Sequence, residues 1–187
     1  MEILFITGNK EKIAIAKAAL EPLNIEVKPL KIDCPEIQED DNEKIAIASA
    51  KCASDFTKSN VVKVDSGLFI EALSGFPGPY AEYVERKLDA QDILKMLAGK
   101  PNRTAYYKEV LAYCEYGKEP IAFTTHTYGK IDTELSGTDG YNFDRIFICD
   151  GDDKTMAHFS QRQRAKKYSH QNWENLVEYL KGKGQMN

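Results

Sequence analysis

One stretch of the sequence decides how the fold is interpreted: Val61-Val62-Lys63-Val64-Asp65-Ser66-Gly67-Leu68-Phe69-Ile70-Glu71-Ala72-Leu73. Its two ends are apolar and predict two buried strands, at 61–64 and 69–73. Asp65 to Leu68 then forms a loop between them. A carboxylate at the end of a buried strand, next to a hydroxyl and a glycine, suits a metal ion or a bound water. Asp, Ser and Gly are also ordinary turn residues, so a simple turn is the alternative interpretation.

Composition and charge narrow the classes of protein. The chain has 187 residues, 42% of them hydrophobic, and a formal net charge of −4. This predicts one domain, residues 1–187, with a substantial core and no general affinity for nucleic acid. The four cysteines, at positions 34, 52, 114 and 149, form no CxxC pair and predict neither zinc nor disulfides. No apolar run is long enough to span a membrane, so we expect a cytoplasmic protein without a membrane partner.

Helices and strands alternate early in the chain, and a hairpin follows. The expected strands lie at 3–6, 25–32, 104–116, 120–131 and 146–148, and the expected helices end at Leu20, cover 42–56 and 89–97, and close the chain. The alternating stretches around Gly117 favour an antiparallel pair. This order predicts an α/β fold with a mixed sheet. We expect the tail from residue 182 to be frayed.

The turn Thr7-Gly8-Asn9-Lys10-Glu11-Lys12 joins the first strand to the first helix. Gly8 can adopt positive φ and let a ligand approach the backbone. The N–H groups that open a helix attract an anion, and Lys10 and Lys12 add positive charge. The turn therefore predicts a phosphate cradle, although the P-loop pattern GxxxxGK[ST] is absent. A capped helix start with solvated lysines is the alternative.

The acidic loop offers Glu36, Glu39, Asp40 and Asp41. Mg²⁺ prefers one or two carboxylates together with phosphate oxygens and water. A solvated loop is the alternative, and it is favoured for Asp40 and Asp41. Lys51 lies near the expected core face of the second helix, where its stem can pack while its ammonium reaches solvent or a phosphate.

Two later segments are suited to a nucleotide base. Tyr141-Asn142-Phe143-Asp144 places aromatic rings beside an acid, so that rings can stack on a base and the carboxylate can accept from its N–H groups. Aromatic side chains folded onto the core are the alternative. Ser169-His170-Gln171 opens the last helix, with Ser169 as the expected N-cap. A basic side chain from 162–167 could meet a phosphate.

Together these segments resemble the inosine/xanthosine triphosphate pyrophosphatase family, whose members hydrolyse non-standard purine triphosphates to monophosphate and pyrophosphate. The resemblance covers nearly the whole chain. In family order, the matching segments are Thr7-Gly8-Asn9-x-x-Lys12, Pro35-Glu36, Lys51, Asp65-Ser66-Gly67-Leu68, Gly75 to Tyr80, Tyr141 to Asp144, and Ser169-His170.

The resemblance implies an elongated mixed β-sheet flanked by helices, with two lobes and a central cleft, and a homodimer. It implies that Glu36 and Asp65 hold Mg²⁺ and that Asp65 also orients or deprotonates the attacking water. The residues implied to grip the triphosphate are Thr7, Asn9, Lys12, Lys51 and Ser66, and those implied to hold the base are Tyr141 to Asp144, His170 and Gln171. Ala165 stands where the family has a lysine, and a shift of one residue lets Lys166 or Arg164 serve.

Several positions depart from the family pattern. Val64 replaces an acid, and Glu82 stands at a position that is typically basic. Gln171 replaces an arginine that reads the purine 6-oxo group. Arginine only donates hydrogen bonds whereas glutamine also accepts, so we expect altered base selectivity. The departures motivate two alternatives: a catalytically weakened homologue that binds nucleotides as a sensor or partner, and a related pyrophosphatase for modified pyrimidine triphosphates.

Overall fold

The computed structural model of the chain describes residues 1–32 and 34–184. Its strands are β1 (Glu2–Ile6), β2 (Glu26–Leu30), β3 (Val61–Ile70), β4 (Pro77–Gly78), β5 (Thr104–Cys114), β6 (Ile121–Ile131) and β7 (Phe147–Cys149). Its α-helices are α1 (Lys10–Leu20), α2 (Asn42–Thr57), α3 (Ala81–Glu85), α4 (Ala90–Met96), α5 (Gln161–Arg164) and α6 (Gln171–Gly184). Short 3₁₀ turns are η1 (Glu21–Leu23), η2 (Glu71–Leu73), η3 (Asn142–Arg145) and η4 (Met156–His158).

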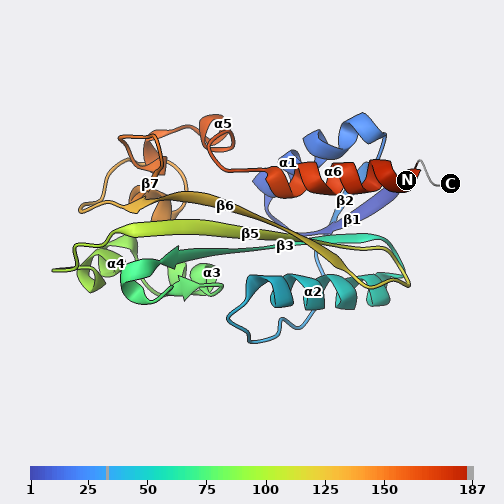
Figure 1. Cartoon of the computed structure of the whole chain (residues 1–187), viewed down its shortest axis with the longest axis horizontal. Coiled ribbons are helices and arrows are strands. Elements are labelled where there is room, and N and C mark those ends of the chain that lie inside the picture. Colours follow the sequence, from blue (N-terminus) through green and yellow to red (C-terminus); the bar gives the residue numbers. More distant parts are fainter. Residues whose placement is uncertain (33, 185–187) are drawn as a thin grey trace. The chain divides into compact units, whose positions relative to one another are not determined.

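Within the described residues, the seven strands form a mixed sheet in the order β2-β1-β3-β5-β6-β7, with β4 paired to β3 (Figure 1). β1 is parallel to both β2 and β3. β4 is antiparallel to β3, and β7 is antiparallel to β6. β5 and β6 are neighbours joined through residues 115–120, a connection short enough for a hairpin. The predicted α/β fold with a mixed sheet is confirmed.

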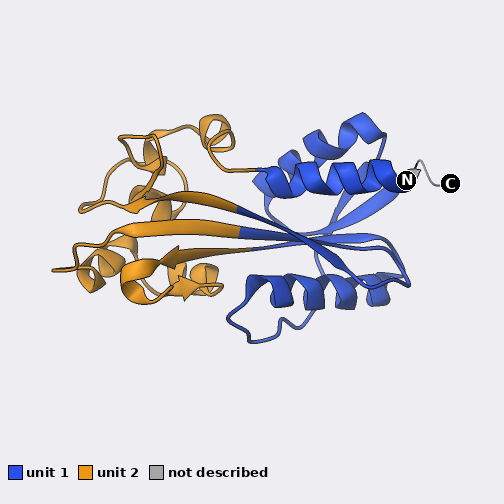
Figure 2. Ribbon diagram, in the orientation of Figure 1, with its two compact units in different colours: residues 1–65, 109–125, 170–187 blue, residues 66–108, 126–169 orange. Residues whose placement is uncertain are grey.

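The described chain divides into two compact units (Figure 2). Unit 1 is built from the described parts of 1–65, 109–125 and 170–187, and unit 2 from 66–108 and 126–169. β3, β5 and β6 each contribute to both units because the boundaries fall inside these strands. Asp65 ends the first segment of unit 1, so the metal and phosphate residues predicted before it also belong to unit 1.

In unit 1, helices cover both faces of the strands (Figure 1). Successive residues of a strand point to opposite faces. Leu111 of β5 accordingly packs with the core that contains α1 and α6, whereas Val110 packs against small residues of α2. Trp173 of α6 meets Phe5 of β1 edge-on, with ring centroids 5.5 Å apart. Burying each such ring stabilises the unit by roughly 1.5–3 kcal/mol.

Unit 2 has a core of its own. It is formed by buried apolar side chains from the end of β3, the helices α3 and α4, and the segment around β7. Ile70, Ile93 and Phe147 are completely buried in it. The loop 141–144 belongs to this unit, and its surroundings are set by this core.

The structure contradicts the predicted loop at Asp65 to Leu68, because β3 runs without interruption through these residues. β4 supplies the reason. Leu68 pairs with Gly78, and a Cβ on Gly67 would lie only 2.6 Å from the carbonyl oxygen of Gly78. Gly67 thus allows a neighbouring backbone to approach closely instead of making a turn. The strand predicted at 69–73 ends at Ile70 and continues as η2.

The end of α6 differs from expectation. The helix begins at Gln171, and the Ser169 N–H donates to Oγ1 of Thr127 at 3.0 Å, while the N-cap role of the Ser169 side chain stays a prediction. The helix continues to Gly184, so residues 182–184 are helical where fraying was predicted. Residues 185–187 of the predicted tail lie outside the described residues.

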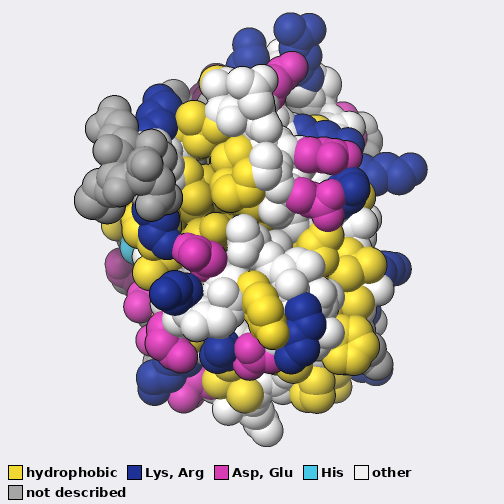
Figure 3. All heavy atoms as spheres, turned by 90° about the vertical axis from the view of Figure 1, so that its right-hand side faces the viewer, with side chains coloured by type: hydrophobic (Ala, Val, Ile, Leu, Met, Phe, Trp, Pro, Cys, Tyr) yellow, Lys and Arg dark blue, Asp and Glu magenta, His cyan; other side chains and the backbone are white. Residues whose placement is uncertain are grey.

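Acidic and basic side chains are interspersed over the face drawn in Figure 3, together with apolar patches. This distribution agrees with the small net charge of −4. Among residues 1–32 and 34–184, no helix combines the length and the apolar character needed to cross a membrane.

Candidate functional site

The carboxyl end of β1 leads into the turn before α1, and β1 pairs in parallel with the first residues of β3. In this parallel pair Leu4 is level with Val61 and Phe5 with Val62, and Asp65 follows Val62 by three residues in β3. The chain leaves β1 to form β2 on one side and returns as β3 on the other. In α/β proteins, a reversal of strand order of this kind opens a ligand site outside the carboxyl ends of the strands.

The turn after β1 is held by its own side chains. The Asn9 N–H donates to Oγ1 of Thr7 at 3.1 Å. Oδ1 of Asn9 accepts from the N–H groups of Glu11 at 2.9 Å and Lys12 at 3.2 Å, which makes Asn9 the N-cap of α1. Two of the N–H groups that were predicted to bind a phosphate therefore already donate to the N-cap side chain.

Gly8 acts differently from the prediction, because its φ is not positive. A Cβ at this position would lie 2.8 Å from Cε of Lys31, so glycine lets that lysine lie across the turn. Lys31 directly follows β2, whose Leu30 is level with Ile6 at the end of β1. With Lys10 and Lys12 in the first turn of α1, three lysines come from two adjacent elements. Their charge has the sign that a phosphate group requires.

Asp65 is partly buried, and its Oδ2 accepts from Nδ2 of Asn42 at 2.5 Å. Burial raises the pKa of Asp65 to about 6 from the ordinary 3.8. The Asn42 hydrogen bond, Lys12 and Lys63 oppose this rise, while the charge of Glu36 adds to it. The result is a carboxylate that is ionised at neutral pH yet more basic than an exposed one. Such a group can accept a proton or bind a cation.

Glu36 is engaged by a residue that the sequence reasoning missed. Nζ of Lys63 lies 2.9 Å from Oε1 of Glu36, and the Lys63 side chain is only 19% exposed. Lys63 stands two residues before Asp65 in β3, so both side chains point to the same face. The Lys63 ammonium therefore neutralises part of the negative charge near Asp65.

The donor set suits Mg²⁺ more than a metal held entirely by protein. Among the described residues, no group of three or more His, Cys, Asp or Glu gathers as a metal site. Glu36 does act electrostatically on Asp65, so two carboxylates share one neighbourhood. Mg²⁺ is bound in many proteins by one or two carboxylates, with water and substrate phosphates completing its shell. The residues fit this ion, and Lys63 competes with it for Glu36.

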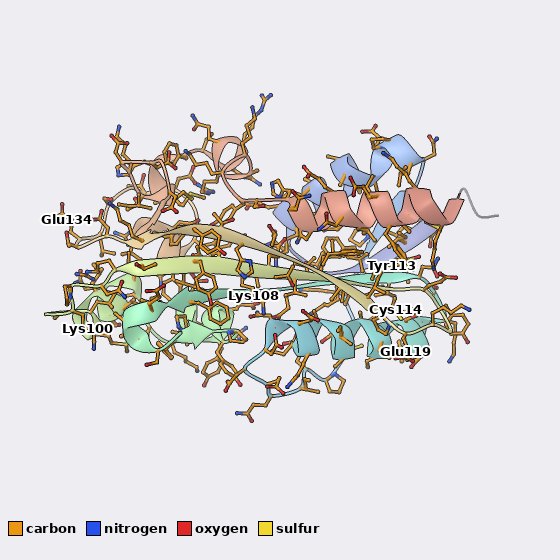
Figure 4. All side chains as sticks on the ribbon, in the orientation of Figure 1. Lys100, Lys108, Tyr113, Cys114, Glu119 and Glu134 are labelled. Atoms are coloured by element: carbon orange, nitrogen blue, oxygen red, sulfur yellow. The ribbon has the colours of Figure 1, made fainter. Side chains whose placement is uncertain are left out.

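Lys51 is not brought to this group. Its Nζ lies 3.1 Å from Oδ1 of Asp55, one turn further along α2. The other charges acting on it are Glu119 and Cys114, which Figure 4 labels where β5 leads into β6. Ser66 follows Asp65 in β3 and points to the opposite face of the strand.

The loop 141–144, which was predicted to bind the nucleotide base, makes most of its contacts within unit 2. Tyr141 is 51% exposed, but Phe143 is only 1% exposed and belongs to the core. Nδ2 of Asn142 donates to the Leu88 carbonyl at 3.0 Å, and its Oδ1 accepts from the Ala90 N–H at 2.9 Å. The packing alternative therefore describes Asn142 and Phe143, and Tyr141 is the residue of the loop that presents a ring to the surface.

Asp144 is likewise turned inward, with 2% exposure. It accepts from the Tyr141 N–H at 2.8 Å and from the Tyr168 hydroxyl at 3.1 Å. Nε of Arg164 lies 3.7 Å away. Burial raises the pKa of Asp144, and these partners oppose the rise. Asp144 thus fixes the shape of the loop.

The basic residues near 165 have different surroundings. Arg164 is buried and donates to the Phe159 carbonyl at 2.6 Å. Lys167 lies 2.6 Å from Oδ1 of Asp152. Lys166, directly after α5, and Arg162, within α5, are the exposed ones.

His170 and Gln171 stand at the start of α6 in unit 1. Nε2 of Gln171 donates to Oδ1 of Asn175 at 3.1 Å, so the side chain lies along its own helix. His170 lines a groove between α1 and α6 with Ile15 and Trp173.

Three side chains of the site escaped prediction: Lys31, Asn42 and Lys63. The period of two along a strand could have placed Lys63 beside Asp65. The parallel pairing of β1 and β2 could have placed Lys31 near the turn. Asn42 carries no such signal, because its contact with Asp65 joins positions 23 residues apart.

The fold and the site define an α/β protein suited to phosphorylated ligands, with lysines around the turn after β1 and a partly buried carboxylate in the neighbouring parallel strand β3. The chain belongs to the Ham1 family, which matches residues 3–173.

Relatives and solved structures agree with this assignment. The chain is 42% identical over 166 residues to the dITP/XTP pyrophosphatase of Methanopyrus kandleri, covering 89% of this chain and 88% of that protein. It is 46% identical over 150 residues to the dITP/XTP pyrophosphatase of Methanosarcina acetivorans, with 80% and 82% covered. The Ham1 protein structure of Staphylococcus aureus superposes with a TM-score of 0.86 at 28% identity, covering 98% of this chain and 100% of that one. A HAM1 protein of Coxiella burnetii gives 0.83 at 26% identity, with 97% and 99% covered.

Proposed function

We propose that this chain hydrolyses non-standard purine nucleoside triphosphates, such as ITP, dITP and XTP, to the monophosphate and pyrophosphate. A water oxygen forms a bond to the α-phosphorus, the bond from that phosphorus to the α–β bridging oxygen breaks, and pyrophosphate leaves. The observation that carries this proposal is Asp65, a partly buried carboxylate in the middle of β3 on which the charges of Lys12 and Lys63 act. The family and its dITP/XTP pyrophosphatase relatives support it.

Asp65 is proposed as the catalytic residue. Its burial makes the carboxylate basic enough to orient the attacking water and take its proton, while it stays ionised at neutral pH. Asp65 and Glu36 would hold Mg²⁺, and Glu36 would then exchange its Lys63 partner for the ion. When bound, Mg²⁺ supplies positive charge that offsets the developing negative charge on phosphate oxygens.

The triphosphate is proposed to lie against the turn after β1. Lys10 and Lys12 open α1, and Lys31 lies across Gly8, so positive charge surrounds the turn. Thr7, Asn9 and Glu11 shape its backbone through the N-cap contacts. Ser66 keeps a proposed contact with phosphate, whereas the place of Lys51 beside Asp55 argues against one.

For the base, the surface residues are the better candidates. Tyr141 offers an exposed ring, Lys166 an exposed ammonium, and His170 and Gln171 polar groups at the start of α6. Asp144 would act by holding the backbone of the loop.

Assembly and place in the cell are also proposed. The whole chain would act as one enzyme domain, as a homodimer. Unit 2 supports a dimer with an aromatic cluster in which Phe69 stacks on Tyr106 at 5.1 Å and Tyr128 is 57% exposed, an apolar surface of the kind that subunits cover. Four free cysteines suit a reducing compartment, the cytoplasm. Light scattering of the purified protein would test the dimer.

The test of function is a panel of inosine, xanthosine, adenosine, guanosine and pyrimidine triphosphates incubated with the protein and Mg²⁺. Ion-exchange chromatography should resolve monophosphate and pyrophosphate from ITP and XTP. Turnover of a pyrimidine triphosphate alone would show that the substrates are pyrimidine and not purine nucleoside triphosphates. Nucleotide binding without hydrolysis of any member would overturn the proposal in favour of a nucleotide sensor.

A further inference from the structure

Asn42 has a contact that its place in the sequence does not explain. It is the first residue of α2 and has no exposed surface. Its side chain lies 2.5 Å from Oδ2 of Asp65. A carboxylate can only accept hydrogen bonds, so the group facing it is the Asn42 amide N–H.

The other end of the same amide is unsatisfied. Oδ1 of Asn42 is buried and has no hydrogen-bond partner among residues 1–32 and 34–184. A buried polar atom without a partner lowers the stability of a fold, and an apolar side chain of similar size would avoid that cost. Stability therefore does not explain why asparagine stands at this position. The hydrogen bond from its amide N–H to Asp65 does explain it.

Helix capping does not account for it either. The N-cap of α2 is Asp41, whose Oδ1 accepts from the Glu43 N–H at 3.0 Å. Asn42 lies inside the helix, at its first residue. The contact also joins α2 to β3 through two residues that are 23 positions apart in the chain.

We propose that Asn42 is a positioning residue for Asp65. Its amide N–H holds Oδ2 and fixes the orientation of the carboxylate. Oδ1 of Asp65 is then presented to the cation or to the attacking water. This inference rests on the role proposed above for Asp65. Groups that orient a metal-binding or reacting carboxylate alter metal affinity or turnover by about 10- to 100-fold when they are removed.

Asn42→Leu tests the inference, because leucine has a similar size, lacks the donor and removes the unsatisfied oxygen. We expect kcat for ITP to fall about 10- to 100-fold at saturating Mg²⁺, with KM changed less than about twofold. Mn²⁺ alone, titrated into the nucleotide-free protein and followed by electron paramagnetic resonance, should bind about tenfold more weakly. Tm should fall, because the ionised Asp65 loses the hydrogen bond that stabilises it, so the folded fraction is measured alongside kcat.

Ser49→Ala is the matched control. Ser49 lies on the same helix, is 3% exposed, and also has a buried oxygen that finds no partner in the described part of the chain. The control removes that oxygen but leaves the amide at Asp65, so its kcat and Mn²⁺ affinity should equal those of the wild type. If Asn42→Leu fails to fold, Asn42→Ala carries the same test with a smaller side chain.

Two outcomes would overturn the inference. One is wild-type kcat and Mn²⁺ affinity in a folded Asn42 variant. The other is a loss of kcat that matches the unfolded fraction measured by circular dichroism. Asp65→Asn, assayed in parallel, separates this failure from failure of the proposed function. If Asp65→Asn is inactive while the Asn42 variants behave as wild type, only the positioning role is wrong; if Asp65→Asn retains turnover, the proposed site itself is misplaced.

Discussion

Replacing Asp65 with asparagine should make the protein more stable while it abolishes turnover. Burial raises the pKa of Asp65 from 3.8 to about 6. An acid with a raised folded-state pKa binds its proton more tightly in the folded chain, so ionising it costs stability. The difference between the two values corresponds to about 3 kcal/mol, at about 1.4 kcal/mol for each pH unit. Asparagine avoids this cost and can still accept from the amide of Asn42.

Because the folded-state pKa of Asp65 is raised, the stability difference between the wild type and Asp65→Asn depends on pH in a defined direction. Below about pH 4 the carboxyl is protonated in both the folded and the unfolded state, so the wild type and the Asp65→Asn variant should differ little in stability. As pH rises toward about 6 the wild type loses stability relative to the variant, and above that value the full difference of about 2–3 kcal/mol should remain. For a chain of this size, that is a gain in Tm of roughly 5–10 °C.

The assay is urea unfolding of both proteins from pH 4 to 8 in EDTA, so that no divalent cation contributes, followed by turnover of ITP with Mg²⁺. Subtracting the two curves removes the other titrating groups. Equal stability at pH 8, or a variant that is less stable there, would refute the burial argument. Turnover retained in the variant would refute the catalytic assignment independently.

Lys12→Ala should weaken triphosphate binding by roughly tenfold and monophosphate binding less, because a lysine charge meets more phosphate oxygens in the longer ligand. Calorimetric titration with non-hydrolysable analogues measures both affinities. Lys51→Ala is the matched control, and its affinities should lie within about twofold of wild type. Equal losses of affinity for the two ligands in Lys12→Ala would speak against the polyphosphate role. Lys63→Met should lower the Mg²⁺ concentration for half-maximal activity by about three- to tenfold, since one competing positive charge is removed; a higher requirement would show that Lys63 supports the cation site. Gln171→Arg should raise the ratio of kcat/KM for ITP over ATP by about tenfold, because arginine donates to a 6-oxo group and cannot accept from a 6-amino group. An unchanged ratio would remove Gln171 from base recognition.

Local patterns predicted much of unit 1. The first strand, the helix that ends at Leu20 and the helix starting at Asn42 follow from the spacing of their apolar residues, with Pro22 as the residue that stops the first helix. Asp65, Glu36 and Lys12 were chosen from residue chemistry together with the resemblance to a known family, and the charges of Glu36 and Lys12 act on Asp65 in the structure.

The predictions failed where a residue had two local interpretations. Asp65-Ser66-Gly67 is compatible with both a turn and a strand, and pairing with β4 decided for the strand. Asn142 and Phe143 look like ligand-binding residues in the sequence, yet their hydrogen bonds and burial tie them to the core of unit 2. Burial and pairing depend on residues far away in the chain, so local spacing carries no information about them.

The sequence by itself determined the α/β class, the positions of most helices and strands, and the candidate acid at Asp65, because periodicity, breakers and residue chemistry act over a few neighbouring positions. Only the tertiary structure decided which groups surround that acid. Asn42, Lys63 and Glu36 reach Asp65 through the crossover from β2 to β3 and the alternation along β3. The physical reason is that a pKa, a buried hydrogen bond and a cation site are set by contacts between segments, and those contacts exist only once the strands are paired.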